Sequence, residues 1–144
     1  MEKNSINKVQ LQTILNSTNI TTATITKGFD LSGYAGKFAV VVDCLSYNAG
    51  DFNITVQYGS SINNAGVLQN PVNLDSKYCF AEVDSRIKRQ LPETINATGQ
   101  YQFAFERPNL LGGDNIEKYF AITITPTNQS GTNEFQVSVV KFND

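Results

Sequence analysis

The sequence predicts an all-β protein, an antiparallel β-sandwich of the jelly-roll or Greek-key-like kind with seven to eight strands. Three observations favour this fold class. Several segments alternate apolar and polar residues with a period of two, which is typical of strands with one buried face. One continuous apolar run is short and rich in β-branched residues. Turn residues separate these segments, and no repeat or domain linker interrupts them.

The N-terminal segment allows two interpretations. Residues 1–8 are polar and unpatterned, as in an arm. The segment then carries four apolar residues that would have no use in an arm left in water: Val9, Leu11, Ile14 and Leu15. The predicted organisation is therefore residues 1–19 as an N-terminal arm or first strand, followed by residues 20–144 as a single β-sandwich domain.

The clearest strand signals lie between residues 38 and 58. The run FAVVVDCL at 38–45 is bounded by glycines before and by Asn48-Ala-Gly50 after, which favours a fully buried strand. Residues 52–58 alternate strictly, with Phe, Ile, Val and Tyr on one face and Asn, Thr and Gln on the other. The turn-rich link at 46–51 predicts that these two strands form a hairpin.

The second half of the chain repeats these signals. Residues 59–69 are expected to form a loop, and residues 78–91 favour a strand or extended segment over a helix. Residues 101–105 alternate and stop before Arg107-Pro108. Two further alternating segments near the C-terminus, at 120–125 and at 135–139, flank a polar loop and predict a second hairpin.

The buried faces of these strands predict a core. The residues expected to face inward are Val41, Ile54, Val56, Phe103, Ile122 and Val137. Cys44 ends the apolar run, where we expect a buried free thiol. Cys79 is the only other cysteine, so the chain has no disulfide framework and no Cys-x-x-Cys pair.

The sequence lacks the residues that most enzymes need. It contains no histidine, which removes the commonest general base and the commonest zinc ligand together. Its two separated cysteines cannot complete a structural zinc site, and no glycine-rich loop leads into a helix. Its carboxylates lie mostly in loops or beside basic residues, as on a solvated surface. We therefore expect no enzyme, no catalytic residue, no cofactor and no metal.

Charge limits the partners. The net charge is −2 and only 17% of residues are charged, which is too neutral for binding nucleic acid through its phosphates. No apolar run is long enough to cross a membrane, and the start of the chain has no secretion signal, so we expect synthesis in a host cytoplasm. Three basic residues, Arg86, Lys88 and Arg89, stand among carboxylates. They form either an ion-paired strand face or a contact patch for a protein.

Four stretches, taken in their order along the chain, resemble a family of small phage head decoration proteins, also called cement or auxiliary capsid proteins. They are residues 27–36 leading into 38–42, residues 52–60 with TVQYGS, residues 80–85 with FAEVDS, and residues 118–125 with KYFAITIT. The resemblance covers roughly residues 20–142. This chain departs from it in the long link between Phe105 and Lys118 and in the extra N-terminal segment.

The resemblance implies a virion protein that binds the outer surface of an assembled capsid and reinforces it. The partner would be the major capsid protein, with this chain present as a homo-oligomer or in many copies. No catalytic residues come with this family. The candidate partner contacts are Val9, Leu11, Ile14 and Leu15 in the N-terminal segment, which could add to a neighbour's strand, and Arg86, Lys88 and Arg89.

Two alternatives remain. A carbohydrate- or receptor-binding β-sandwich of a phage tail or fibre would have a similar composition. It normally stacks aromatic residues on sugars, and because tryptophan is absent its candidates are Tyr34, Tyr47, Tyr58, Tyr78 and Tyr101. A shell-forming capsid protein is the other alternative, although the chain has no obvious basic arm for a genome.

Overall fold

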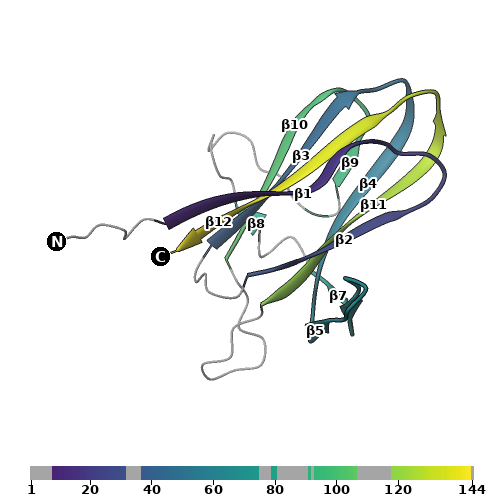
Figure 1. Cartoon of the computed structure of the whole chain (residues 1–144). Helices are drawn as coiled ribbons and strands as arrows, with labels where there is room; N and C mark the ends of the chain where they lie inside the picture. The colour runs from purple at the N-terminus through teal and green to yellow at the C-terminus, as the bar shows by residue number, and fades with distance from the viewer. Residues whose placement is uncertain are drawn as a thin grey trace.

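The computed structural model of the chain consists of strands and turns wherever it is described (Figure 1). The described residues are 8–31, 37–74, 79–80, 91, 93–106 and 118–143. Along the long strands, buried side chains alternate with partly exposed ones, as in residues 52–57. The predicted all-β class is confirmed.

The strands form two antiparallel sheets that enclose one hydrophobic core. Sheet A has the order β1 (Lys8–Asn19), β12 (Glu134–Asn143), β3 (Lys37–Ser46), β10 (Gly99–Glu106) and β8 (Cys79–Phe80). Sheet B has the order β2 (Ile25–Asp30), β11 (Tyr119–Ser130), β4 (Ala49–Gly59) and β7 (Val72–Asn73), with β9 (Glu93–Ile95) also paired to β4. The short strands β5 (Ser61–Ile62) and β6 (Leu68–Gln69) form a separate pair.

Consecutive long strands pass from one sheet to the other. β1 leads to β2, β3 leads to β4, and β11 leads to β12, and in each case one strand belongs to sheet A and the other to sheet B. The pairs that do form join distant parts of the chain, such as β1 with β12 and β4 with β11. This is the strand arrangement of a jelly roll, in which the antiparallel chain wraps around its own core. The predicted sandwich is confirmed.

Both hairpins predicted from the sequence are wrong. β3 and β4 are joined by a tight link, yet β3 pairs with β12 and β10, whereas β4 pairs with β11. β11 and β12 likewise lie in different sheets. The physical reason is that period-two alternation reports which face of a strand is buried and not which strand lies beside it. A short turn can fold a chain over onto the opposite layer as well as back along the same one.

The strand count also differs from the seven to eight expected. The described residues contain twelve strands, of which seven are six residues or longer. The other five, β5 to β9, are two or three residues long and occupy the region expected to hold loops and one extended segment. Most of that predicted segment, residues 81–90, lies outside the described residues.

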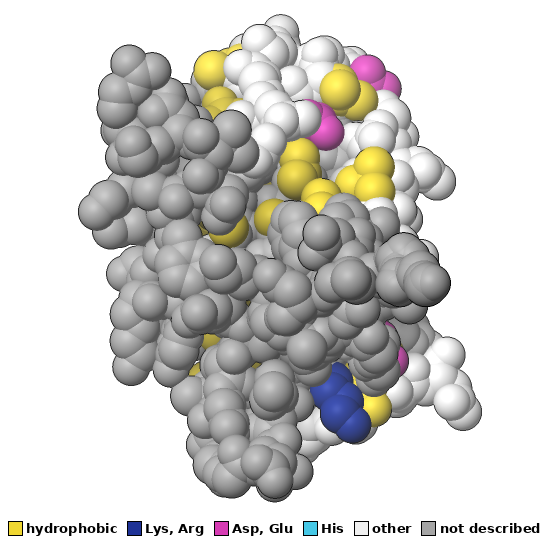
Figure 2. Space-filling model, turned by 90° about the vertical axis from the view of Figure 1, so that its left-hand side faces the viewer, with side chains coloured by type: hydrophobic (Ala, Val, Ile, Leu, Met, Phe, Trp, Pro, Cys, Tyr) yellow, Lys and Arg dark blue, Asp and Glu magenta, His cyan; other side chains and the backbone are white. Residues whose placement is uncertain are grey.

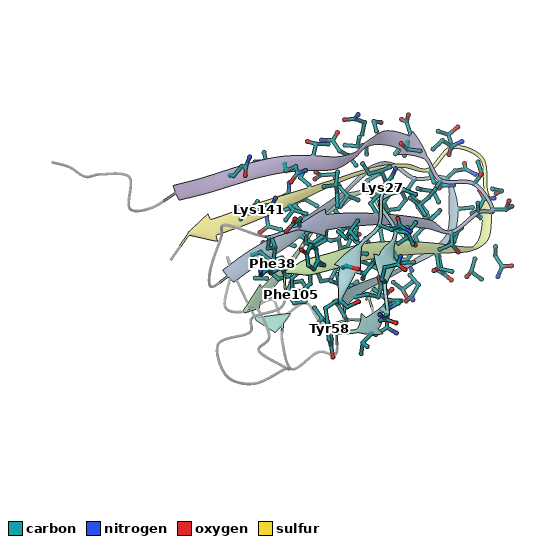
Figure 3. All side chains as sticks on the ribbon, turned by 60° about the horizontal axis from the view of Figure 1, so that its bottom comes forward. Lys27, Phe38, Tyr58, Phe105 and Lys141 are labelled. Atoms are coloured by element: carbon teal, nitrogen blue, oxygen red, sulfur yellow. The ribbon has the colours of Figure 1, made fainter. Side chains whose placement is uncertain are left out.

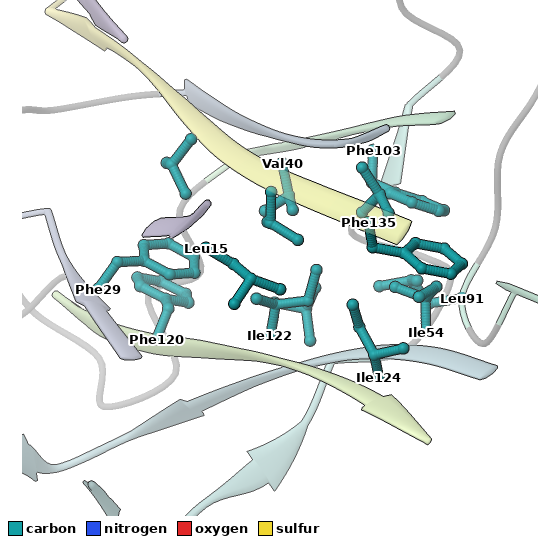
Figure 4. Close-up of a cluster of buried hydrophobic side chains, with 14 of the residues drawn as sticks. Leu15, Phe29, Val40, Ile54, Leu91, Phe103, Phe120, Ile122, Ile124 and Phe135 are labelled. Atoms are coloured by element: carbon teal, nitrogen blue, oxygen red, sulfur yellow. The ribbon is translucent and has the colours of Figure 1, made fainter. Parts of the chain in front are cut away.

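The core lies between the two sheets (Figure 4). Five of the six residues predicted to face inward are buried there: Ile54, Val56, Phe103, Ile122 and Val137. The sixth, Val41, is only half-buried, because β3 sends Val40 and Val42 into the core and Val41 to the outer face. A continuous apolar run carries no alternation, so its register could not be derived from the sequence.

Cys44 is a free cysteine buried in the core, as predicted. Burial disfavours the thiolate and raises the pKa of the Cys44 thiol. Its Sγ lies 3.5 Å from the carbonyl oxygen of Ser46. The side chain of Cys79 lies outside the described residues.

The segment between β4 and β7 folds against the outer face of sheet B. It approaches so closely that a Cβ on Gly28 would lie 2.9 Å from the carbonyl oxygen of Gly66. A Cβ on Gly59 would collide with the carbonyl oxygen of Gln69. Beside them Ala121, which points outward from β11, is nearly fully buried. Glycine and alanine are therefore required here because the second layer of backbone leaves no space for larger side chains.

At one end of the sandwich, Asn133 ties three connections together. The side chain is fully buried, and its Oδ1 accepts hydrogen bonds from the backbone N–H groups of Asn48 (2.7 Å) and Ala49 (3.2 Å). Its Nδ2 donates to the carbonyl oxygen of Ser130 at 3.1 Å. The backbone N–H of Asn133 donates to Asn19 Oδ1 at 2.9 Å. The satisfied side-chain amide thus fixes two turns between the sheets, and the backbone N–H of the same residue fixes the end of β1.

Lys141 makes a corresponding link further along β12. It lies opposite Phe38 of β3, and Figure 3 shows both at the same end of the molecule. The side chain is buried, and its Nζ donates to the backbone carbonyl oxygen of Asp30 at 2.9 Å. Burial lowers the pKa of Lys141, while the nearby Asp30 carboxylate acts in the opposite direction. The ammonium therefore joins sheet A to the end of β2.

Candidate interaction surface

β1 is the edge strand of sheet A. It pairs with β12 on one side, and the described part of the chain provides no strand on its other side. The register with β12 is unbroken from Lys8 to Thr13, and it shifts between Thr13 and Leu15 and again between Leu15 and Thr18. The first half of β1 is therefore a regular strand, whereas the second half is irregular. A regular edge leaves main-chain donors and acceptors available for another strand.

The composition of β1 leaves this edge open. From Val9 to Asn19 the strand contains no charged residue and no proline. Charged side chains, proline, bulges and short length are the means by which most edges avoid pairing with other chains. Here only the bulges are present, and they come after Thr13. On the outer face of the regular half, Leu11 is 65% exposed.

The other edges are protected. β7, β8 and β9 have two or three residues each, too few to offer a long row of backbone groups. β2 has six, and two of them are the charged residues Lys27 and Asp30. Lys27 lies opposite the core residue Ile122, so its exposed side chain starts from the inner face of the edge strand. An inward-directed charge of this kind opposes pairing, because an added strand would have to bury it.

The inner face of the regular half of β1 is not covered by sheet B. Gln10 and Gln12 point to the same side as the core residue Val139, which lies opposite Gln12, yet both are exposed. The same end of β1 projects together with the end of β12 in Figures 1 and 3. Another strand could therefore lie beside residues 8–13 without meeting the second sheet.

The structure separates the predicted contact residues into three groups. Leu11 is on the surface, where a partner could reach it. Leu15 is 8% exposed and belongs to the core, which leaves it little surface for a partner, and Ile14 is partly buried against that core. That these two residues are contacts stays a prediction. The irregular register after Thr13 turns Leu15 inward. Four predicted contacts have side chains outside the described residues: Val9, Arg86, Lys88 and Arg89.

An apolar row crosses the outer face of sheet A from this edge. Leu11 lies opposite Val140, Val140 opposite Ala39, and Ala39 opposite Ala104. Leu11 is exposed and Val140 partly exposed, whereas the two alanines are buried. Residues that lie directly opposite one another in antiparallel strands share a face of the sheet. Leu45, which is 51% exposed, lies on the same face of β3 but six residues further along the strand from Ala39.

The outer face of sheet B is polar. Thr26 and Thr123 hydroxyls are 3.1 Å apart, and the Thr123 hydroxyl donates to Gln57 Oε1 at 3.0 Å. Gln57 Nε2 donates in turn to Thr55 Oγ1 at 2.7 Å and to Asn73 Oδ1 at 3.0 Å. This polar ladder crosses β2, β11, β4 and β7 with uncharged groups only. On the face drawn in Figure 2 the described charged side chains are likewise sparse.

The described residues offer little for chemistry. They contain no group of three or more cysteines or carboxylates placed to hold a metal ion. Burial raises the pKa of Cys44 and lowers that of Lys141, and these two residues lie on different strands. No helix among the described residues is long and apolar enough to cross a membrane.

No protein-family model and no curated protein matches the chain. Among solved structures, the chain is similar to part of a chain in the structure of infectious bursal disease virus Gx strain, with 8% identity over 95% of this chain and a TM-score of 0.46. It is similar to a T13 particle of the same virus, with 12% identity over 99% of this chain and a TM-score of 0.42. The chain spans 33% and 32% of the length of those viral chains.

A bacterial structure also resembles this chain. It holds the CBM22-1-GH10 modules of endo-1,4-beta-D-xylanase 10B from Clostridium thermocellum, complexed with xylohexaose. The identity is 11% and the TM-score 0.37, over 94% of this chain and 28% of that chain. At these identities and TM-scores, the likenesses assign neither a family nor a function to the chain.

Proposed function

We propose that the chain is a structural protein of a virion, which binds the outer surface of an assembled phage capsid in many copies and stabilises it. The observation that carries this proposal is the open edge of β1, with its regular half at residues 8–13 and its exposed Leu11. Such an edge can bind the main chain of another protein. It is a liability in a protein that acts alone and an asset in one that assembles.

The family resemblance directs the proposal toward the capsid. Two of the four resembling stretches, residues 52–60 and 118–125, include paired segments of β4 and β11 in the middle of sheet B. A third begins in β2, which pairs with the other side of β11. Stretches that are far apart in the sequence therefore meet in one sheet.

The surface suits such a role. Only 17% of the residues are charged, and the outer face of sheet B is a ladder of uncharged groups. Many copies on one particle would let weak individual contacts add through multivalency. The proposal includes no enzymatic activity, no metal and no cofactor. The major capsid protein is the proposed partner, and the capsid surface the proposed location.

The test uses heads of the phage that encodes the chain. Quantitative mass spectrometry of purified heads is expected to find the chain in a fixed ratio to the major capsid protein. Heads from a deletion mutant are expected to release DNA at a lower temperature and to recover when purified chain is added. Absence from the heads, or equal stability with and without the chain, would overturn the proposal.

The contribution of β1 is measured in the same experiment. Leu11→Lys places a charge on the open edge and is expected to weaken rebinding to deletion-mutant heads. Leu45→Lys adds the same charge on the same face of sheet A, away from the edge, and should rebind like the wild type. Deleting residues 1–19 is a poor test, because residues 8–19 form a strand of the sandwich. If the purified chain forms closed shells without capsids, it is a shell protein instead.

The polar ladder favours a second candidate, binding of a carbohydrate on sheet B. Its amide and hydroxyl groups resemble those that bind sugars, but the predicted aromatic platform is not found in the described residues. Three of the candidate tyrosines are partly buried against the core: Tyr47, Tyr58 and Tyr101. The other two, Tyr34 and Tyr78, lie outside the described residues. Specific binding on a glycan array that Gln57→Ala abolishes and Leu11→Lys retains would establish this function in place of the first.

A further inference from the structure

The regular half of β1 is complementary to itself. Residues 9–13 read Val-Gln-Leu-Gln-Thr, and the reversed order is Thr-Gln-Leu-Gln-Val. The two readings differ only in exchanging valine and threonine, which are both β-branched and of similar size. A two-fold interface requires one surface patch to be complementary to itself. We propose that two copies of this chain join through β1, as antiparallel edge strands with Leu11 opposite Leu11.

The faces of the strand agree with this register. Residues directly opposite each other across an antiparallel pair point to the same side, so both Leu11 side chains would meet on the outer face. There each Leu11 lies beside the partly exposed Val140 of its own copy, so apolar side chains would continue across the interface. On the inner face Gln10 would lie opposite Gln12 of the other copy, where the two amides can exchange hydrogen bonds.

The charges agree as well. Lys8 is the only charged residue of β1. In this register it lies opposite Ile14 of the other copy, so the two Lys8 residues stand at opposite ends of the paired segment. Like charges directly opposite each other would oppose pairing. The second edge on this side of the sandwich, β2, carries Lys27 on its inner side and lacks this self-complementarity.

Space permits the pairing. Gln10 and Gln12 start from the inner face and are exposed, so sheet B does not extend over residues 10–12. The added strand of a second copy would therefore meet the edge of β1 before it meets β2. Two five-stranded sheets would then form one continuous sheet of ten strands. Each copy satisfies the main-chain groups that the other leaves at its edge.

This inference goes beyond the proposed function but uses the same edge of β1, so a paired copy must separate before that edge can bind a capsid. The two are tested separately, because pairing is measured on the purified chain without heads. Sedimentation or light scattering is expected to give twice the 15.8 kDa chain mass, falling to the single mass on dilution. Leu11→Lys should give the single mass with unchanged melting of the monomer. Leu45→Lys, equally polar but away from the edge, should keep the double mass. An equimolar mixture of the Leu11→Lys and Leu11→Glu chains should restore the double mass.

The register has its own test. In chains carrying Cys79→Ser, mild oxidation of Leu11→Cys should link two copies through a disulfide, because directly opposite positions in a sheet bring the two Cβ atoms within reach. Buried Cys44 should not compete. Gln10→Cys, shifted by one position, should link far less. Three results would overturn the inference: a wild-type chain with the single mass at every concentration, loss of the double mass in Leu45→Lys, or linkage through Gln10→Cys in place of Leu11→Cys.

Discussion

The two edge strands β1 and β2 are neighbours in the chain and yet differ in how they meet the solvent. Both contribute to the core: β1 inserts Leu15, and β2 inserts Phe29, whose ring stacks on Phe120 with centroids 5.8 Å apart. β2 is six residues long and places Lys27 on its inner side. β1 is twelve residues long and carries no charge after Lys8.

The comparison shows that burial and edge protection are separate properties of a strand. Packing of apolar side chains between the sheets anchors both strands, and it says nothing about whether the free backbone of either strand can pair. That depends on length, regularity and charge. The length and charge of β2 protect its edge from pairing, whereas the edge of β1 is left open. This is the pattern expected when pairing through one edge is useful.

Asn133→Ala should give one of the two largest effects, because the buried side-chain amide of Asn133 holds the link between β3 and β4 against the link between β11 and β12. The substitution leaves the partly buried N–H groups of Asn48 and Ala49 without their acceptor. We expect the free energy of unfolding to fall by about 2–5 kcal/mol, since each unsatisfied buried group costs about 1–3 kcal/mol. Urea denaturation of both chains measures this difference in the free energy of unfolding. Thr132→Ala, an exposed neighbour, should change it by under about 0.5 kcal/mol. Similar losses in both variants would contradict the assignment.

Leu15→Ala and Leu11→Ala separate the two roles of β1. Leu15 is in the core, so its truncation should lower the free energy of unfolding by about 2–5 kcal/mol. Leu11 is exposed, so its truncation should change the stability of the monomer by less than about 0.5 kcal/mol. Both values come from denaturation at a concentration where the chain is monomeric. If Leu11→Ala cost as much as Leu15→Ala, β1 would not have the register described.

Lys141→Met tests the link between β12 and the end of β2. Burial lowers the pKa of Lys141 in the folded chain below its unfolded value of about 10.4, so between these two pKa values only the unfolded chain keeps the proton. The free energy of unfolding contributed by this group therefore rises with pH across that window, up to about pH 10.4.

Lys141→Met should remove this rise. At neutral pH the variant should stay within about 1 kcal/mol of wild type, because the lost hydrogen bond to Asp30 is offset by the absence of a buried charge. Denaturation of both chains from neutral to alkaline pH measures the difference between their slopes. Equal slopes in the two chains would show that Lys141 is not desolvated in the fold.

Lys27→Val should have the smallest effect on stability and a visible effect on association. Lys27 is exposed, so the free energy of unfolding should change by less than about 0.5 kcal/mol. The edge of β2 would then carry only Asp30 as a charged residue, and we expect additional species larger than the pair to form as concentration rises. Light scattering detects them. An unchanged mass distribution would show that Lys27 does not protect the edge.

The sequence predicted which face of each strand is buried better than it predicted which strands lie side by side. Strict alternation in β4 and β11 identified Ile54, Val56 and Ile122 correctly as core residues, because period two is a local property of the strand. The partner of each strand depends on residues far away in the chain. For that reason the hairpin predictions failed, although each predicted turn overlaps the shorter link between its two strands.

The candidate surface was predicted only in part. The apolar residues of the N-terminal segment were recognised, but the assignment of Leu11 to the surface and of Leu15 to the core depends on the register shift after Thr13, for which the sequence has no signal. That β1 is an edge depends on the strand order of the whole sheet. Neither Asn133 nor Lys141 was singled out, since a polar residue near a strand end is ordinarily solvated.

The pairing of β1 with β12 also determines how the chain must fold. Lys8 lies opposite Asn143, so the contact spans nearly the whole described chain. Contacts between distant residues close large loops and slow the folding of sandwiches. On the ribosome β1 would wait until almost all of the chain has emerged, with both of its sides unpaired. The strand that is open on one side in the finished protein is therefore open on both during synthesis, and we expect premature association to be the main hazard of its biogenesis.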